Sequence, residues 1–208
     1  MRKRVLLLAV SCKTGGLCPG GLDLDDPSKW IRIVRDDGNA GAVQGCEINF
    51  ANPLDIIEFD GRPIPQGKQQ ENWVIDNNSC EKTGSRTQDD LDWVFQHYAY
   101  KSFWGNYKAF LNEDEFNAVN VPSESILKVS DVDIYKKTNR WKIDFNWHRA
   151  MYKIKGVSMT DPDFYHNNDS VHIDNAYIVI SIPKEIDWIH PETGEKQAYK
   201  FVSKIYKI

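Results

Sequence analysis

The chain has few of the features that mark a zinc-binding or disulfide-stabilised protein. Its 208 residues include only four cysteines, and none of them forms a C-x-x-C pair: Cys12, Cys18, Cys46 and Cys80. Zinc fingers and ribbons need such spacing, so buried thiols in a reducing compartment are the better interpretation. A composite site made of Cys12, Cys18 and a distant Cys or His stays open as the alternative. We therefore expect neither a bound metal nor a cofactor.

Long hydrophobic runs are also missing. The apolar run Val5–Val10 follows three basic residues and imitates a signal peptide, but its six residues are fewer than the ~7 to 15 of a signal-peptide core. No run approaches the roughly 20 apolar residues of a membrane span. We interpret Val5–Val10 as a first buried β-strand and expect a cytoplasmic protein without membrane contact.

An excess of positive charge is absent as well. The 26 Lys and Arg residues are outnumbered by 30 Asp and Glu residues, which gives a formal net charge of −4. Proteins that coat duplex DNA are usually basic, because neutralising phosphates dominates non-specific affinity. Any nucleic acid bound here would need a local basic groove with stacking, or the ligand would be a small nucleotide.

What the chain does have is enough apolar material for a folded core. Hydrophobic residues make up 41% of it and aromatic residues 12%, including seven Trp. A length of 208 residues allows one large domain or two small ones. In the first third, short β-like segments such as Trp30–Val34, Leu54–Phe59 and Trp73–Ile75 alternate with turn-rich stretches. This spacing predicts a small barrel or sandwich.

The hydrophobic period then changes from two to 3.6 residues. Thr87 is a good N-cap for a helix, and a second short helix is expected to start at Asn112 with acidic residues in its first turn. The apolar positions of the first helix follow helical spacing: Leu91, Val94, Phe95 and Tyr98. We therefore predict the principal helix of the chain within residues 87–121.

The second half returns to a clear β pattern of five strands. A strand at Ser125–Lys137 is followed by a tight turn at Thr138-Asn139 and by a strictly alternating segment. One face of that segment carries four large apolar side chains: Trp141, Ile143, Phe145 and Trp147. Such a stripe could be a stacking platform for bases, but the core of a barrel is the favoured interpretation.

A glycine-rich stretch after the first strand is the most informative motif. Residues 11–21 contain four glycines, among them Gly15 and Gly16, and glycine lets backbone N–H groups approach an anion closely. Lys13 and Arg32 would add positive charge there as solvated cations, and Trp30 would stack on a base. The spacing fits neither a Walker loop nor a dinucleotide-binding fingerprint. A wide hairpin turn is the competing interpretation.

Two further clusters carry polar chemistry. Glu71 and Asn72 offer donors and acceptors that suit base edges or a ribose hydroxyl, although Asn72 could equally serve a turn before a strand. Asp161, with His166 and His172 nearby, is the one cluster suited to acid–base or metal chemistry. The alternative is that Asp161 only pins a loop that begins at an Asp-Pro step, and no nucleophile–base spacing is present.

These motifs together resemble the start and body of the bacterial dual OB-domain family. The segment S-x-K-x-G-G-x-C-x-x-G at 11–21 is followed by W-I-R at 30–32, and the later matches are P-L-D-I-I at 53–57, Q-E-N at 70–72, M-T-D-P at 159–162 and the strand at 199–205. The chain departs from the family pattern at Pro19, where a small or β-branched residue is expected. The resemblance implies two OB-type barrels and recognition of nucleic acid or nucleotides in prokaryotic conflict and defence systems.

The sequence thus predicts a mainly β protein with two OB-like antiparallel β-barrels joined by a helical connector. The expected boundaries are 1–86, 87–121 and 122–208. The leading hypothesis is a non-enzymatic module that binds single-stranded nucleic acid or a nucleotide, with a protein partner encoded nearby. Its binding residues would be Lys13, Gly15, Gly16, Trp30, Arg32, Glu71 and Asn72. The alternatives are an enzyme that acts on a nucleotide or nucleic acid through Asp161 and His166, and a protein–protein adaptor.

Overall fold

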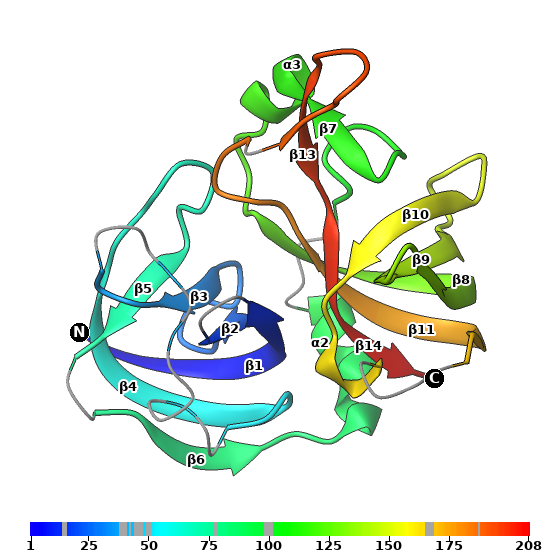
Figure 1. Ribbon diagram of the computed structural model, residues 1–208. Helices are drawn as coiled ribbons and strands as arrows, with labels where there is room; N and C mark the ends of the chain where they lie inside the picture. Colours follow the sequence, from blue (N-terminus) through cyan, green and yellow to red (C-terminus); the bar gives the residue numbers. More distant parts are fainter. Residues whose placement is uncertain are drawn as a thin grey trace. The chain divides into compact units, whose positions relative to one another are not determined.

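The computed structural model describes residues 1–13, 16–37, 41, 43, 48, 51–76, 79–97, 102–164, 169–186 and 188–208, with only the backbone of Cys12, Lys13 and His97. The chain divides into two compact units, Met1–Tyr100 and Lys101–Ile208. Each unit is built on a β-barrel, which confirms the predicted fold class. In Figure 1 the strands of the first unit run from blue to teal and those of the second from green to red.

The first unit is a six-stranded sheet in the order β1-β2-β3-β5-β4-β6. An additional pairing of β1 with β4 closes the first five strands into a ring, and β6 adds to the outer edge of β4. The pairings are antiparallel except that of β3 with β5, which is parallel. The strands are β1 (Arg2–Lys13), β2 (Gly16–Asp23), β3 (Trp30–Val34), β4 (Asp55–Pro63), β5 (Asn72–Ile75) and β6 (Glu81–Ser85).

Strand β1 explains why the start of the chain is so apolar. Residues 5–10 are all buried, so Val5–Val10 is the buried strand predicted from the sequence. Val5 and Leu7 point into the same apolar cluster as Ile33, Ile57 and Phe59. Alternate residues of a strand face opposite sides, yet Leu6 and Leu8 are buried too. The strand is therefore covered on both faces, as its unbroken apolar run requires.

The second unit contains a closed barrel in the order β10-β14-β11-β8-β9. Here too one pairing is parallel, that of β10 with β14. The barrel strands are β8 (Glu124–Lys137), β9 (Arg140–Asn146), β10 (Ile154–Met159), β11 (Val171–Ser181) and β14 (Phe201–Lys207). A three-stranded sheet is added from β7 (Phe110–Asn112), β12 (Trp188–Ile189) and β13 (Lys196–Tyr199).

Both rings share one connectivity. In each, the third and fifth strands of the ring pair in parallel, and the fourth strand closes the ring against the first. Five strands in a partly open or closed Greek-key ring are the arrangement of an OB fold. The two units are therefore two versions of the same architecture.

The helices with described bounds are short and lie where the hydrophobic period changes. A 3₁₀ turn at Gln88–Asp90 leads into α2 (Leu91–His97), and the Thr87 backbone N–H donates to the Asp90 carboxylate at 2.9 Å. Helix α3 (Glu113–Asn117) is capped by Asn112, which accepts from the Glu115 N–H at 2.8 Å. The second short helix thus starts at Asn112, as the sequence predicted, and Asn112 is its N-cap.

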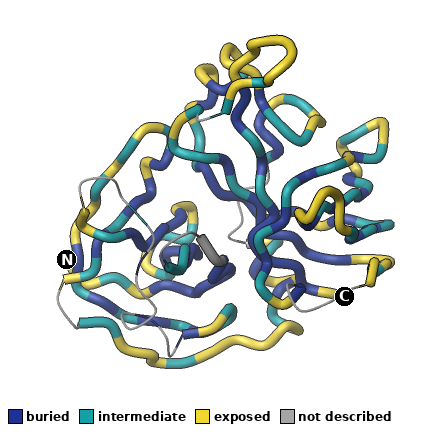
Figure 2. Tube along the Cα trace, viewed as in Figure 1, coloured by how far each residue is buried: buried dark blue, intermediate teal, exposed yellow. Residues whose placement is uncertain are grey.

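The apolar stripe of β9 forms barrel core. Trp141, Ile143, Phe145 and Trp147 are each no more than 7% exposed, so the core interpretation is confirmed over the stacking platform. Figure 2 shows the inner strand segments in dark blue and the exposed turns in yellow. Thr138 and Asn139, at the β8–β9 turn, have φ of 51° and 62°, as a type I′ hairpin requires.

A buried lysine ties two segments of the second unit together. Lys200, between β13 and β14, is fully buried, and its Nζ donates to the Phe103 carbonyl at 2.8 Å and to the Asn106 carbonyl at 2.9 Å. The same nitrogen lies 3.7 Å from the centre of the Phe103 ring. Burial lowers the pKa of Lys200 to about 6.

Candidate functional site

Two of the predicted binding motifs meet on neighbouring strands of the first unit. Arg32 on β3 lies directly opposite Asn72 on β5, and on its other side it lies opposite Gly20 of β2. The Arg32 backbone N–H donates to the Glu71 carbonyl at 2.9 Å. The parallel β3–β5 pair thus brings the W-I-R and Q-E-N segments into one cluster, which we call the β3–β5 cluster: Trp30, Arg32, Glu71 and Asn72.

The β3–β5 cluster is buried. Trp30 is 2% exposed and Asn72 is fully buried, while Arg32 and Glu71 are each 8% exposed. Arg32 Nε lies 3.9 Å from Glu71 Oε1, so the guanidinium is next to an opposite charge in a place with little water. The expectation that Arg32 is a solvated cation is wrong, because all five residues of β3 are buried and the strand is therefore covered on both faces.

Several polar atoms of this cluster lack a hydrogen bond. Among the residues that the structure describes, Trp30 Nε1 and both polar side-chain atoms of Asn72 have no hydrogen-bond partner. Buried polar groups are almost always paired, and each unpaired one costs about 1–3 kcal/mol. The cluster therefore presents a donor and a donor–acceptor pair that a bound polar molecule would satisfy.

The glycine-rich stretch is mostly strand rather than loop. Gly16–Asp23 forms β2, and Lys13 pairs with Gly16 across the β1–β2 hairpin. A side chain at Gly21 would place its Cβ 2.0 Å from the Leu6 carbonyl oxygen, so this glycine is needed for the close approach of β2 to β1. Most of the stretch is thus one arm of the β1–β2 hairpin, and residues 14–15 at its turn lie outside the described residues.

Part of the predicted phosphate site lies outside the described residues. This applies to Gly15 and to the side chain of Lys13, whereas Gly16 is half-buried. Arg32 lies opposite Gly20, four residues along β2 from Gly16. At about 3.3 Å per residue, the backbones of Lys13 and Arg32 are then separated by roughly 13 Å along the sheet.

The alternative catalytic residue Asp161 is bonded to its own chain. It is fully buried, and its carboxylate accepts from the Ile205 N–H at 2.9 Å and the Asp163 N–H at 3.2 Å. Lys204 Nζ lies 3.4 Å from the same carboxylate and also pairs with Asp163. Burial raises the pKa of Asp161. These contacts pin the loop after β10 to β14, while His166 lies outside the described residues.

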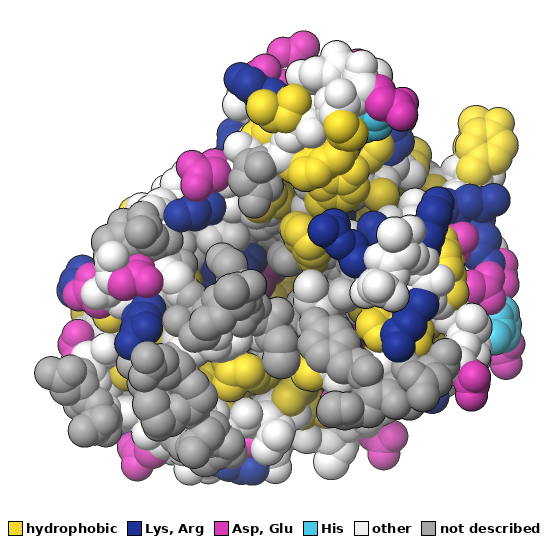
Figure 3. Space-filling view, viewed as in Figure 1, with side chains coloured by type: hydrophobic (Ala, Val, Ile, Leu, Met, Phe, Trp, Pro, Cys, Tyr) yellow, Lys and Arg dark blue, Asp and Glu magenta, His cyan; other side chains and the backbone are white. Residues whose placement is uncertain are grey.

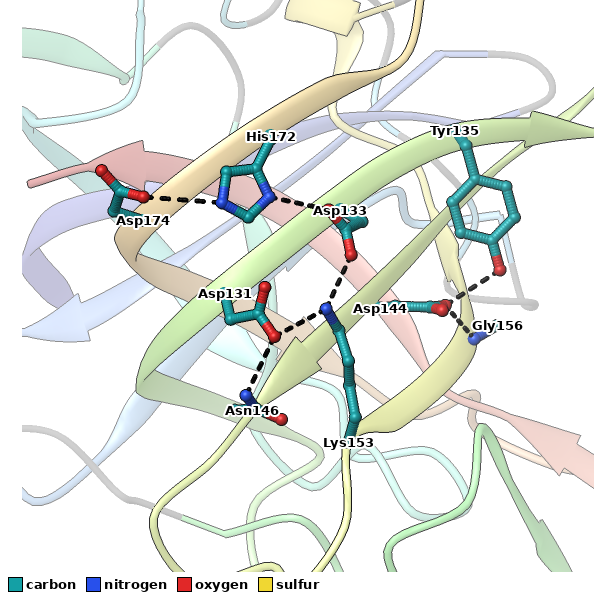
Figure 4. Close-up of polar contacts among 9 residues, drawn as sticks. All are labelled: Asp131, Asp133, Tyr135, Asp144, Asn146, Lys153, Gly156, His172 and Asp174. Carbon is teal, nitrogen blue, oxygen red and sulfur yellow. Dashed lines mark hydrogen bonds and ion pairs between the residues drawn. The ribbon is translucent and has the colours of Figure 1, made fainter.

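A polar network that sequence reasoning did not find covers one face of β8, β9 and β11 (Figure 4). Lys153 donates to Asp131 at 2.9 Å and to Asp133 at 2.6 Å, so its ammonium lies between two carboxylates. His172 Nδ1 is 2.7 Å from Asp133, and this hydrogen bond raises the pKa of His172. Lys153 supplies the positive charge that these carboxylates attract, which makes the network an ion-pair cluster between strands.

The same network continues to Asp144. The Tyr135 hydroxyl and the Gly156 N–H donate to this carboxylate at 2.9 Å and 2.7 Å (Figure 4). Burial and the Asp144 carboxylate raise the pKa of Tyr135 to about 12. The alternation of Asp131, Asp133 and Tyr135 along β8 was the available signal, but their partners come from distant parts of the chain.

Comparison with known proteins bears on the whole chain. No helix among the described residues is long and apolar enough to cross a membrane. No curated protein and no solved structure matches the chain. A family model described as a dual OB-containing domain matches residues 3–205, which includes both barrels and the β3–β5 cluster. The chain therefore belongs to the dual OB-containing domain family.

Proposed function

We propose that this protein is a non-enzymatic module that binds single-stranded nucleic acid or a nucleotide, and that the β3–β5 cluster of the first unit contacts the ligand. Its family supports the proposal, because OB folds generally bind oligonucleotides. The resemblance described above also supports a role as a sensor in a prokaryotic defence or conflict system, beside a protein encoded nearby.

One observation carries the assignment of the site. Asn72 is fully buried, and neither its side-chain oxygen nor its side-chain nitrogen has a hydrogen-bond partner among the described residues. A primary amide with one donor and one acceptor face matches the polar edge of a base. A ligand that hydrogen-bonds to this amide would remove the free-energy cost of its unpaired polar atoms in the unliganded protein.

The neighbouring residues have distinct proposed roles. Arg32 would bind a phosphate or a base edge through its forked N–H groups, as guanidinium groups do. Glu71, 3.9 Å from Arg32, would hold that guanidinium in place. Trp30 would donate its indole N–H, which has no hydrogen-bond partner among the described residues. Lys13, Gly15 and Gly16 would add phosphate contacts at the β1–β2 turn.

The alternative hypothesis of an enzyme with Asp161 and His166 has less support. A general base needs a carboxylate oxygen free to take a proton from water or substrate. The Asp161 carboxylate accepts two backbone N–H bonds and faces the ammonium of Lys204. This arrangement accounts for Asp161 as a structural residue.

The test is a binding titration at low salt. It uses a labelled oligothymidylate of about ten nucleotides, within the site sizes of OB folds, and separately the common nucleoside triphosphates. Arg32→Gln should weaken binding about 10- to 100-fold, as expected for a charged hydrogen bond of about 1.5–3 kcal/mol. Arg62→Gln is the matched control, because Arg62 is an exposed cation of the same unit.

Melting curves of both variants accompany the titration, because Arg32 is buried. Arg32→Lys adds a variant that keeps the charge but loses the fork, and it should bind more weakly than the wild type while staying folded. If the wild type binds no oligonucleotide and no nucleotide at low salt, the proposal fails and the adaptor hypothesis takes its place. If Arg32→Gln and Arg62→Gln weaken binding equally, the loss comes from the change in net charge and not from the β3–β5 cluster.

A further inference from the structure

A separate groove lies on the second unit. It has a volume of about 520 Å³ and is bounded by the β8–β9 turn, by β9 and β10, and by the start of β14. Lys136 and Arg140 line it from the two sides of the turn, and Phe201 lines it from β14. Figure 3 shows dark-blue Lys and Arg side chains beside yellow hydrophobic ones over the region where β9 and β10 lie. We call this site the β9–β10 groove.

The charge of the groove has one sign. Lys136, Lys137, Arg140 and Lys142 all lie at or next to the β8–β9 turn, and none of them forms an ion pair with a described residue. Lys142 lies beside the groove and donates at 2.9 Å to the hydroxyl of Ser158, which lines it. Burial and the nearby charges of Arg140 and Lys137 lower the pKa of Lys142. These cations therefore repel one another, and an anion would relieve the repulsion.

Acidic groups occupy the opposite end of the same strands. Asp131 and Asp133 lie on β8 at a distance from the turn and are paired with Lys153. Lys136 is three residues beyond Asp133, which corresponds to about 10 Å along a strand. Side chains three residues apart on a strand leave it on opposite faces, so Asp133 does not line the groove, and a polyanion held by Lys136 would lie over β9, β10 and β14.

Aromatic groups line the basic end. Phe201 is half-buried within the groove, and Tyr199 is half-buried with its ring 5.8 Å from the Lys142 ammonium. The Lys136 ammonium lies 4.9 Å from the centre of the Trp141 ring, which holds this long side chain beside the groove. A partly open aromatic ring among cations suits an unpaired base and its phosphates, whereas the bases of a duplex are already stacked.

We infer that the β9–β10 groove is a second nucleic-acid site that binds the backbone and an unpaired base of a single strand. Lys136, Arg140 and Lys142 bind phosphates, and the Phe201 ring stacks on a base. This inference shares the ligand class of the proposed function but none of its residues. The two sites can therefore fail independently.

The test measures binding of a labelled oligothymidylate of about ten nucleotides to the full chain over a range of salt. The double variant Lys136→Gln/Arg140→Gln should bind about tenfold or more weakly than the wild type. Its slope of log K against log salt should fall by about 1.4, because each lost phosphate contact on a single strand removes about 0.7. The control Lys155→Gln/Lys207→Gln removes the same charge from exposed lysines of the same unit outside the groove.

A second measurement locates the strand directly. Photocrosslinking with a 5-iodouridine oligonucleotide should label the peptide that contains Tyr199 and Phe201, and Phe201→Leu should reduce this labelling. The inference is overturned if the control pair weakens binding as much as the groove variant does. It is also overturned if crosslinks are confined to the first unit, or if a duplex binds more tightly than a single strand. If Arg32→Gln abolishes nucleotide binding while the groove variant still weakens binding of the oligonucleotide, the inference stands independently of the first site.

Discussion

Arg32 and Asn72 face each other across the parallel strands β3 and β5, and the Arg32 N–H bonds to the carbonyl of Glu71. Two motifs about 40 residues apart in the sequence thus form one buried polar cluster. The parallel pairing of the third and fifth strands, which is part of OB connectivity, brings them together. The fold itself therefore creates the candidate site.

Replacing Gly21 tests the close approach of β1 and β2. We expect Gly21→Ala to lower the free energy of unfolding by about 1–3 kcal/mol or more, because the new Cβ would lie 2.0 Å from a backbone oxygen of Leu6. Gly84→Ala is the control, since its Cβ would meet only Ile56 Cδ1 at 3.7 Å. Urea unfolding of the two variants measures the difference, and equal stabilities would contradict the assigned role of Gly21.

The buried side-chain amine of Lys200 predicts a pH dependence of stability. Its pKa is lowered from 10.5 to about 6 in the folded state, so between these values the unfolded chain binds more protons. The free energy of unfolding should therefore rise with pH in this range, by at most about 1.4 kcal/mol per pH unit. Lys200→Met should flatten this rise, as measured by urea unfolding near neutral pH and near about pH 9.

The same variant also removes donors from the carbonyls of Phe103 and Asn106, so its overall stability is expected to fall. The slope with pH, and not the stability at one pH, is the quantity that reports the titration of Lys200. Parallel slopes for wild type and Lys200→Met would show that this residue does not titrate as described.

Asp161 is expected to act on stability. Asp161→Asn replaces an oxygen acceptor of the Ile205 or Asp163 N–H by a donor, and should cost about 1–3 kcal/mol. Asp163→Asn should cost less than about 1 kcal/mol, because the Asp163 side chain is 67% exposed. Chemical denaturation compares the two. If the wild type hydrolyses an oligonucleotide and Asp161→Asn does not, although its stability is unchanged, the catalytic hypothesis is restored.

Exposed His172 offers a local check on the β8–β11 network. Its hydrogen bond to Asp133 raises its pKa above the ordinary 6.5. An NMR titration should show this higher pKa, and Asp133→Asn should lower it. A His172 pKa that does not change in Asp133→Asn would mean that the hydrogen bond is absent in solution.

Local patterns predicted the parts of the fold that depend on neighbours in sequence. Asn112 was recognised as the start of a short helix because the acidic residues of the first helical turn follow it directly. Thr138 and Asn139 separate two alternating segments, which is enough to locate a hairpin turn. The burial of Trp141 and Phe145 followed from strict alternation, since one face of a barrel strand must point inward.

Contacts between distant segments were beyond reach of such patterns. Arg32 was expected to be solvated, because nothing near it in sequence shows that both faces of β3 are covered. The ion pairs of Lys153 with Asp131 and Asp133 join a loop to β8, and only the barrel register places them together. The same holds for the cations of the β9–β10 groove, whose partner Phe201 comes from β14.

Melting curves of wild type and Asn72→Leu, each with and without ligand, test the central claim most directly. The ligands are the oligothymidylate and the nucleotides of the binding titration, and Asn175→Ala is a control at an exposed position. We predict that without ligand Asn72→Leu is at least as stable as the wild type, because an apolar side chain removes unpaired buried polar atoms. Ligand at about 100 times its Kd should stabilise the wild type and Asn175→Ala by about 2.7 kcal/mol, but not Asn72→Leu. The claim is contradicted if no ligand stabilises the wild type and if Asn72→Leu without ligand has a free energy of unfolding several kcal/mol below that of the wild type.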